Sequence, residues 1–208
     1  MRKGIRLAAP LFPAVAALGA SFGVLAHSGH IDALAAVVMS ATTFAGSSQV
    51  AAASVLGAGG SVAAAVVAAL LLNARYAPIG ISIAHSFRGS VLKRLVQAQL
   101  VVDESWALSR GNLPVLLAIG GMLWIAWVGG TAIGAIAGQA LGDTSKFGLD
   151  GAFAALFVAL LATQIRSRSR AAVAIVGAAI AAVVIPLTPP GVPIIASTAA
   201  VLVGLRRV

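Results

Sequence analysis

Uncharged and mostly apolar runs dominate the chain. The longest covers positions 33–74, and others cover 7–31, 111–142, 151–165 and 171–205. A helix needs about 20 apolar residues to cross the hydrocarbon core of a bilayer, so most of these runs can hold one or two spans. Only 9% of the 208 residues are charged, whereas a soluble domain has about 25%. The sequence therefore predicts an all-α polytopic membrane protein.

The composition also excludes several classes of protein. The chain has no cysteine, so it has no disulfide framework, thiolate metal site or cysteine nucleophile. Its net charge of +9 comes from short basic clusters between hydrophobic runs, a pattern typical of membrane proteins rather than of nucleic-acid binding. The loose spacing of His27, His30 and Asp32 indicates a solvated loop rather than a metal site. With no glycine-rich phosphate loop and no hydrolase-like Ser/His pairing, we expect neither an enzyme nor a bound cofactor.

Glycine and polar residues divide the runs into segments. At 1.5 Å per residue, a continuous helix over 33–74 would be about 63 Å long, twice the thickness of the hydrocarbon core. This run must fold back, and the glycine-rich stretch Gly57–Ser61 is the natural turn. We predict about seven to eight transmembrane segments: spans over 8–26 and 34–56, a broken segment over 62–87, a span over 114–142, a span ending at 166, and two short helices within 171–205.

The basic residues predict how these segments are oriented. When both termini and positions 88–110 and 166–170 are placed in the cytoplasm, 12 of the 14 lysines and arginines lie on that side. This orientation requires an even number of crossings before Arg88. We therefore expect the interrupted 62–87 segment to be a hairpin of two short helices that returns to its starting side.

The last run has the same shape as the broken segment, because prolines and a glycine interrupt it at 188–193. The chain then reads as a single transmembrane domain, 1–208, built from two parallel repeats, 1–110 and 111–208. Transporters often carry such repeats, and their interrupted helices indicate the substrate site.

The predicted second span is unusually polar for a helix in lipid. Ser40 and Ser47 share one face of it, and Gly46 and Gln49 lie on the adjacent face. Small hydroxyl groups around a glycine could line a substrate path. They are also typical of close packing between membrane helices, because small side chains let two backbones approach. Gln49 is harder to explain by packing alone.

Arg75 is the one charge that interrupts a hydrophobic segment. A charge at membrane depth costs about 2.5 kcal/mol or more, so it needs a partner or an aqueous cavity. Together with Asn73 it could bind a substrate carboxylate at the break in the helix. The alternative is a structural arginine that snorkels to the membrane interface or pairs with Asp103 or Glu104.

Two further features each have two readings. Asp103 and Glu104 could form a pair for proton coupling or ammonium binding, or they could be ordinary acidic residues at the start of a helix or partners for the nearby Lys93 and Arg94. Gly130, Gly134 and Gly138 form a close-contact face that meets either its own bundle or another chain.

Three stretches together resemble the AzlC-like family of branched-chain amino-acid exporters. They are Met39-Ser40 with Phe44-Ala-Gly-Ser-Ser-Gln49, Asn73-Ala-Arg-Tyr76, and Asp103-Glu104. The chain departs from the family pattern at Ser48, where alanine is commoner, and at Val50, where an aromatic residue is common. The resemblance covers nearly the whole chain.

The resemblance implies a secondary transporter that exports branched-chain amino acids across a bacterial inner membrane, with a small AzlD-like membrane subunit as its partner. An amino-acid zwitterion needs a clamp for its carboxylate, oxygen ligands for its ammonium and an apolar pocket. The candidates for these roles are Ser40, Gly46, Ser47, Gln49, Asn73 and Arg75. The alternatives are a channel or exporter for another small solute, and a membrane assembly subunit that does not transport.

Overall fold

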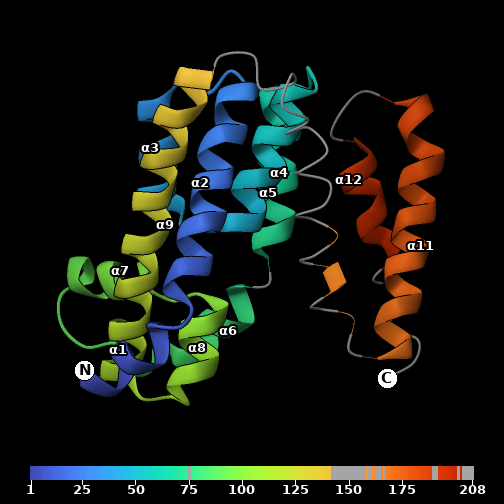
Figure 1. Cartoon of the computed structure of the whole chain (residues 1–208). Coiled ribbons are helices and arrows are strands. Elements are labelled where there is room, and N and C mark those ends of the chain that lie inside the picture. Colours follow the sequence, from blue (N-terminus) through green and yellow to red (C-terminus); the bar gives the residue numbers. More distant parts are fainter. Residues whose placement is uncertain are drawn as a thin grey trace.

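The described part of the chain is helical. The structure is a computed structural model, and it describes residues 1–74, 76–141, 158, 161–162, 165, 167–188, 192–200 and 202. Every regular element within these ranges is an α-helix or a short 3₁₀ helix. The predicted all-α class is thereby confirmed, and Figure 1 shows the longer helices standing side by side.

α2 (Phe12–Ser28) forms the first span predicted over 8–26, and the short helix α1 (Arg2–Ala8) precedes it. The two helices are inclined to each other by 60° across a short break. Pro13 lies in the first turn of α2, where a missing N–H costs nothing because that group has no acceptor within the helix. The long helix therefore begins at Phe12 rather than at Ala8.

A hairpin of two short helices, α3 (Ala33–Thr43) and α4 (Gly46–Gly57), replaces the predicted straight second span. The side chain of Asp32 caps the start of α3. α4 runs back to this end of the bundle, because the carbonyl of Ala53 lies against Gly29. The prediction of one continuous span over 34–56 is wrong.

The hairpin is about half as long as a membrane span. Its helices have 11 and 12 residues, or about 17 Å each, against about 30 Å for the hydrocarbon core. The chain reverses at Phe44, which adopts the left-handed conformation (φ 44°, ψ 48°) and closes α3. The tip of the hairpin therefore lies inside the bundle.

The next two helices form a bent span. The turn predicted at Gly57–Ser61 is confirmed, and the hydroxyl of Ser61 caps α5 (Val62–Asn73). α5 and α6 (Tyr76–Ala84) are inclined by 49°, so the hairpin predicted over 62–87 is wrong. Counted as one bent span, α5–α6 agrees with the even number of crossings expected before Arg88, because the chain turns back in the preceding α3–α4 segment instead.

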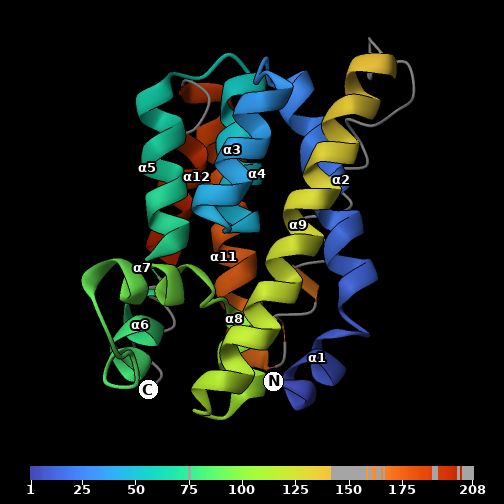
Figure 2. The same cartoon turned by 90° about the vertical axis from the view of Figure 1, so that its left-hand side faces the viewer.

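α9 (Leu113–Leu141) is the central helix of the bundle. It has 29 residues, begins as predicted with Pro114 in its first turn, and packs against α1, α2, α3 and α8 (Asp103–Ser109). The short helix α7 (Val91–Gln99) lies across the direction of α9 near one end of the bundle (Figure 2). The hairpin tip packs against the middle of α9.

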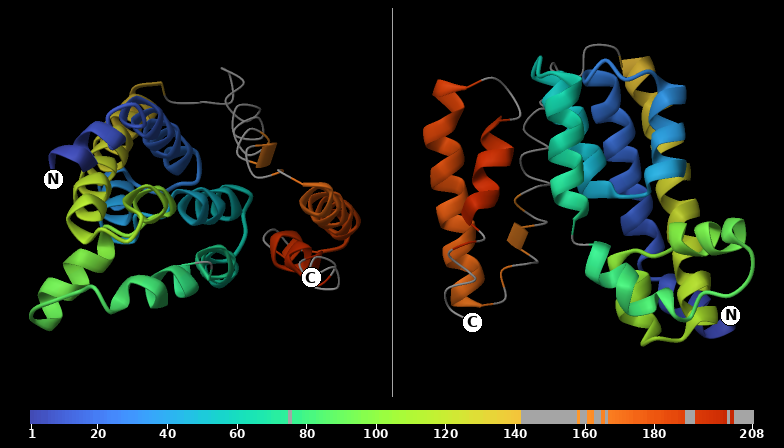
Figure 3. Two further views of the ribbon diagram at one scale, coloured as in Figure 1. Left: turned by 90° about the horizontal axis from the view of Figure 1, so that it is seen from below. Right: turned by 180° about the vertical axis from the view of Figure 1, so that it is seen from behind.

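The last run divides into two helical pieces, as predicted. α11 (Arg168–Val184) continues as the 3₁₀ turn η2 (Ile185–Leu187), and α12 (Val192–Ser197) leads into η3 (Thr198–Ala200). The two pieces pack together, since a Cβ on Gly177 would lie 3.6 Å from the Ala200 side chain (Figure 3). Of the predicted break at 188–193, positions 189–191 lie outside the described residues.

Two described helices, α9 and α11 with η2, are each long and apolar enough to cross a membrane, and the bent pairs α1–α2 and α5–α6 raise this number to four. Most of residues 142–164 lie outside the described part. The count of seven to eight segments and the two repeats, 1–110 and 111–208, therefore stay predictions.

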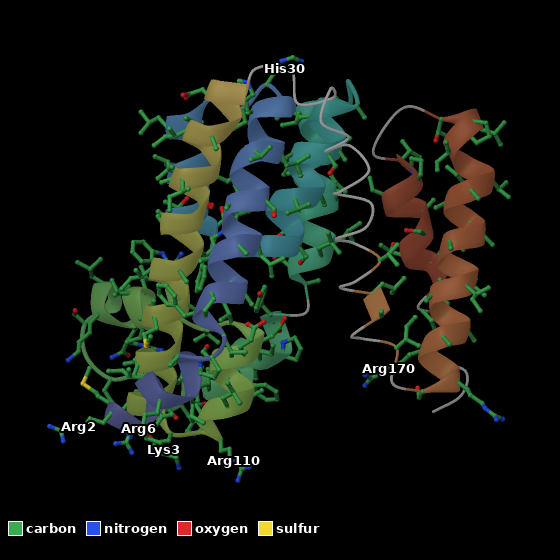
Figure 4. The ribbon with its side chains drawn as sticks, in the orientation of Figure 1. Arg2, Lys3, Arg6, His30, Arg110 and Arg170 are labelled. Atoms are coloured by element: carbon green, nitrogen blue, oxygen red, sulfur yellow. The ribbon has the colours of Figure 1, made fainter. Side chains whose placement is uncertain are left out.

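The labelled basic residues lie at one end of the bundle. Arg2, Lys3, Arg6 and Arg110 gather there, Arg170 lies at the same end of α11, and His30 lies at the opposite end (Figure 4). This basic end includes the N-terminus and the loop before α9, two of the positions that the charge pattern assigns to one side of the membrane.

Candidate functional site

The candidate site is the tip of the α3–α4 hairpin, where the carboxyl end of α3 meets the amino end of α4. Both ends carry unpaired backbone groups, because a helix leaves its first N–H and last C=O groups without intrahelical partners. In a bilayer such groups need other partners, since lipid supplies none. Among the described residues, the side chains around the tip satisfy some of these groups and not others.

Gln49 binds the two helices of the hairpin to α9. Its Oε1 accepts hydrogen bonds from the Ala45 N–H and from Trp127 Nε1, each 3.1 Å long. Its Nε2 donates to the hydroxyl of Ser40 over 2.9 Å. The indole and backbone N–H groups can only donate, which assigns the oxygen of the amide to their side. Gln49 and Ser40 are both fully buried.

These bonds continue as a directed chain back to α9. Thr131 donates its hydroxyl hydrogen to the Trp127 carbonyl over 2.8 Å, so Ser40, which lies 2.8 Å away, donates to Thr131. Ser40 in turn accepts from Gln49. The network thus begins and ends on Trp127, and such a closed set of bonds in a dry interior is rigid. Gln49 thus uses both acceptor positions of its oxygen and one of its two N–H donors, and it has a structural role in this conformation.

The carboxyl end of α3 is capped from a distant part of the chain. Nε2 of Gln99 donates to the carbonyls of Ala41 and Thr42 over 3.0 and 2.9 Å, and Nε1 of Trp124 donates to Ala41 over 3.0 Å. These donors replace the amides that the next turn of a continuous helix would supply. They explain how the chain can reverse at Phe44 inside the bundle.

The amino end of α4 is open by comparison. The N–H groups of Gly46, Ser47 and Ser48 have no acceptor among the described residues, and α4 has no side-chain cap. The Oγ of Ser47 is buried and also lacks a hydrogen-bond partner there. Free N–H groups at the positive end of a helix dipole favour an anion or a carboxylate.

Asn73 comes from α5 to the side of this amino end. Its Oδ1 lies 2.7 Å from the hydroxyl of Ser48, which also lies 2.9 Å from the Ala45 carbonyl. One hydroxyl hydrogen serves one acceptor at a time, so a flipped Asn73 amide that donates to Ser48 satisfies both contacts. Asn73 therefore reaches the hairpin, whereas Arg75 lies outside the described residues.

Gly46 and Trp127 fit together at the tip. A Cβ on residue 46 would lie 2.7 Å from Cη2 of the Trp127 ring, closer than carbon atoms can approach. The ring also stacks on Phe22 with centroids 6.1 Å apart. The glycine thus makes room for the aromatic side chain whose N–H holds Gln49.

The coupling candidates Asp103 and Glu104 form the first turn of α8, where acidic side chains face the free N–H groups of a helix. This position agrees with the interpretation of the two residues as ordinary acidic residues at the start of a helix.

The glycine stripe of α9 packs inside the bundle. A Cβ on Gly130 or Gly134 would meet the backbone of α2 at Ala16 or Ala20, and one on Gly138 would lie 3.1 Å from the His27 side chain. Of the two readings of the stripe, contact within its own bundle is the one found. Small residues here let α2 and α9 approach closely.

The sequence prediction brought together Ser40, Gly46, Ser47, Gln49 and Asn73, and all five lie at the hairpin tip or beside it. It missed four polar partners: Trp127 and Thr131 at the network, and Gln99 and Trp124 at the end of α3. An available signal was the polarity of these groups inside or beside apolar segments, because a buried indole N–H usually finds an acceptor.

The family model described as AzlC protein matches residues 10–141. The branched-chain amino acid transport protein AzlC of Bacillus subtilis (strain 168) is 28% identical over 163 residues, which are 74% of this chain and 64% of that protein. This chain therefore spans slightly less than two thirds of that relative.

An uncharacterized membrane protein of Archaeoglobus fulgidus is 29% identical over 204 residues, which are 92% of this chain and 88% of that protein. No solved structure matches the chain significantly. The family match includes the whole hairpin, α5 and α9 and exceeds half of the chain, so this protein belongs to the AzlC protein family.

Proposed function

We propose that this chain is a secondary transporter that exports branched-chain amino acids across a bacterial inner membrane, together with a small AzlD-like membrane subunit. The observation that carries the proposal is the hairpin tip, where backbone N–H groups and the hydroxyl of Ser47 lie inside a helical bundle without a hydrogen-bond partner in the described part of the chain. The name of the Bacillus relative supports the choice of substrate.

The tip has the polarity of an amino-acid zwitterion. The amino end of α4 is the positive end of its dipole and suits the carboxylate, while the carboxyl end of α3 is negative and suits the ammonium group. Discontinuous helices of transporters bind substrates and ions in this way. In this proposal Ser47 and the N–H groups of Gly46 and Ser48 bind the carboxylate, with Asn73 and Arg75 beside them.

The proposal also places the chain in the membrane. The basic end of the bundle faces the cytoplasm with both termini, and His30 faces the outside. Asp103 and Glu104, on the cytoplasmic side, are the candidates for proton coupling.

Transport is tested by the efflux of labelled valine from proteoliposomes that contain the chain with its second subunit, with and without a proton gradient. A saturable flux that leucine and isoleucine compete for supports the proposal. Flux that never saturates indicates a channel, and labelled solutes of other classes test a different exporter. No flux of any solute indicates an assembly subunit.

The carboxylate site is tested with Ser47→Ala. Loss of the hydroxyl should raise the KM for valine several-fold without reducing the amount of folded protein. The matched control is Ser54→Ala, seven residues later on the same helix. Equal KM values for Ser47→Ala and the wild type would remove Ser47 from the site but leave the transport function standing.

Arg75 is tested by comparing Arg75→Lys with Arg75→Ala. Lysine keeps the charge but lacks the planar fork that grips a carboxylate. If Arg75 binds substrate, both variants should fold and both should lose transport. If lysine restores transport and alanine lowers expression, Arg75 is structural.

A further inference from the structure

The short helix α7 has an exposed apolar face that no described element covers. Val91, Leu92, Leu95 and Val96 are 74%, 73%, 62% and 58% exposed. Their spacing of one, four and five residues places them on one side of the helix. Four large aliphatic side chains on one face are too many to be left in water without a partner.

The opposite side of α7 is basic. Lys93 and Arg94 are exposed there, and Arg88 lies just before the helix. Positions 88–99 contain these three cations and no acidic residue. A short helix with an apolar face and a cationic face is typical of segments that lie in the surface of an anionic bilayer.

Gln99 fixes the direction in which the apolar face points. It follows Leu92 by seven residues and Leu95 by four, so it shares their side of the helix. Its amide donates to the carbonyls of Ala41 and Thr42 at the end of α3. The carbonyls of a helix point toward its carboxyl end, so Gln99 approaches them from the basic end of the bundle.

The apolar face of α7 therefore points along the bundle toward its middle, and the cations point toward the basic end. A helix that lies across the spanning helices in this setting (Figure 2) has its aliphatic side chains at the level of acyl chains and its cations at the level of headgroups. A protein partner beside the bundle would not require this orientation.

We propose that α7 lies flat in the headgroup region of one leaflet and binds anionic lipid there, with its aliphatic face in the acyl chains and Lys93 and Arg94 at the phosphate groups. Lipid binding then positions Gln99 under the end of α3, so the membrane surface supports the hairpin tip. This inference rests on the membrane location of the chain and does not depend on what is transported.

The test uses the absence of native cysteine from the 208 residues of this chain. Leu92→Cys, on the apolar side of α7, and Lys93→Cys, on its basic side about 100° away, are each labelled with a fluorophore and reconstituted in phosphatidylcholine vesicles with or without phosphatidylglycerol. We expect lipid-borne nitroxide to quench the label at position 92 several-fold more than the label at position 93. Aqueous iodide should show the reverse order. The difference should be larger with phosphatidylglycerol and should shrink at high salt.

Circular dichroism and gel filtration of each variant show that it is folded before labelling. Equal quenching of both labels by iodide in phosphatidylglycerol vesicles overturns the proposal. Protection of position 92 that requires the second subunit also overturns it, in favour of a protein partner. Lipid contact that is identical with and without phosphatidylglycerol removes the role of anionic lipid.

Discussion

Replacing Gln49 with methionine should loosen the hairpin while keeping its volume. Methionine is similar to glutamine in length and shape but cannot form the three hydrogen bonds that the Gln49 amide makes. The Ala45 N–H and Trp127 Nε1 would lose their acceptor, and Ser40 would lose one donor. Because these groups are buried, water cannot replace the missing bonds without entering the bundle.

The loss of stability follows from the groups left behind. Side-chain hydrogen bonds within membrane bundles average about 0.6 kcal/mol, so three of them give roughly 2 kcal/mol. Two stranded buried donors cost about 1–3 kcal/mol each, so an upper figure is about 6 kcal/mol. We expect Gln49→Met to lower the free energy of unfolding by roughly 2–5 kcal/mol. For a chain of this size that is a fall in Tm of about 5–15 °C.

The assay is thermal unfolding of the purified protein in detergent, followed by circular dichroism. The matched control is Gln97→Met, because the Oε1 of Gln97 is buried without a hydrogen-bond partner among the described residues. Its loss should leave Tm unchanged or raise it slightly. In a double-mutant cycle, Gln49→Met should cost less in a Trp127→Phe background, where one donor is already absent. Equal Tm values for Gln49→Met and the wild type would refute the network.

Two more predictions concern packing and orientation. Gly134→Leu should prevent α2 and α9 from approaching and leave little folded protein on gel filtration, whereas Gly129→Leu, where a Cβ meets nothing within 4 Å, should fold normally. A monodisperse, stable Gly134→Leu protein would contradict the close contact. In intact cells, an impermeant thiol reagent should label His30→Cys and spare Ser90→Cys. Labelling of Ser90→Cys from outside would reverse the proposed orientation.

The class of fold follows from simple properties of the sequence. Long uncharged runs predict helices, the glycine-rich stretch at 57–61 predicts a turn, and Pro114 predicts the start of α9. Each of these depends on a local rule about one segment, and each agrees with the structure. The choice of site residues also began from a local rule, that polar groups in an apolar run need an explanation.

The hydrogen-bond partners of these residues could not be predicted from such local rules. Gln49 and Trp127 are 78 positions apart, and Gln99 lies 57 positions from Thr42. Such contacts depend on how the helices pack. The predicted faces of the second span also failed for a physical reason: a face is defined only within one continuous helix, and the break at Phe44 brings Ser40 onto Gln49 instead.

The sequence predicts a hairpin at 62–87, whereas the structure has one at α3–α4. The charge count does not determine which segment turns back. Positive charge in the loops constrains the number of crossings to be even, but any one segment can satisfy that rule by turning back. The segment that turns back must satisfy free backbone groups inside the membrane, so it needs polar side chains of its own. Positions 40–49 contain six hydroxyl or amide side chains, whereas positions 62–72 contain only alanine, valine and leucine. A segment that bends without leaving many groups unpaired, as α5 and α6 do, can remain apolar. The polarity of positions 40–49 thus favours this segment as the hairpin, and the same polarity makes it the candidate site.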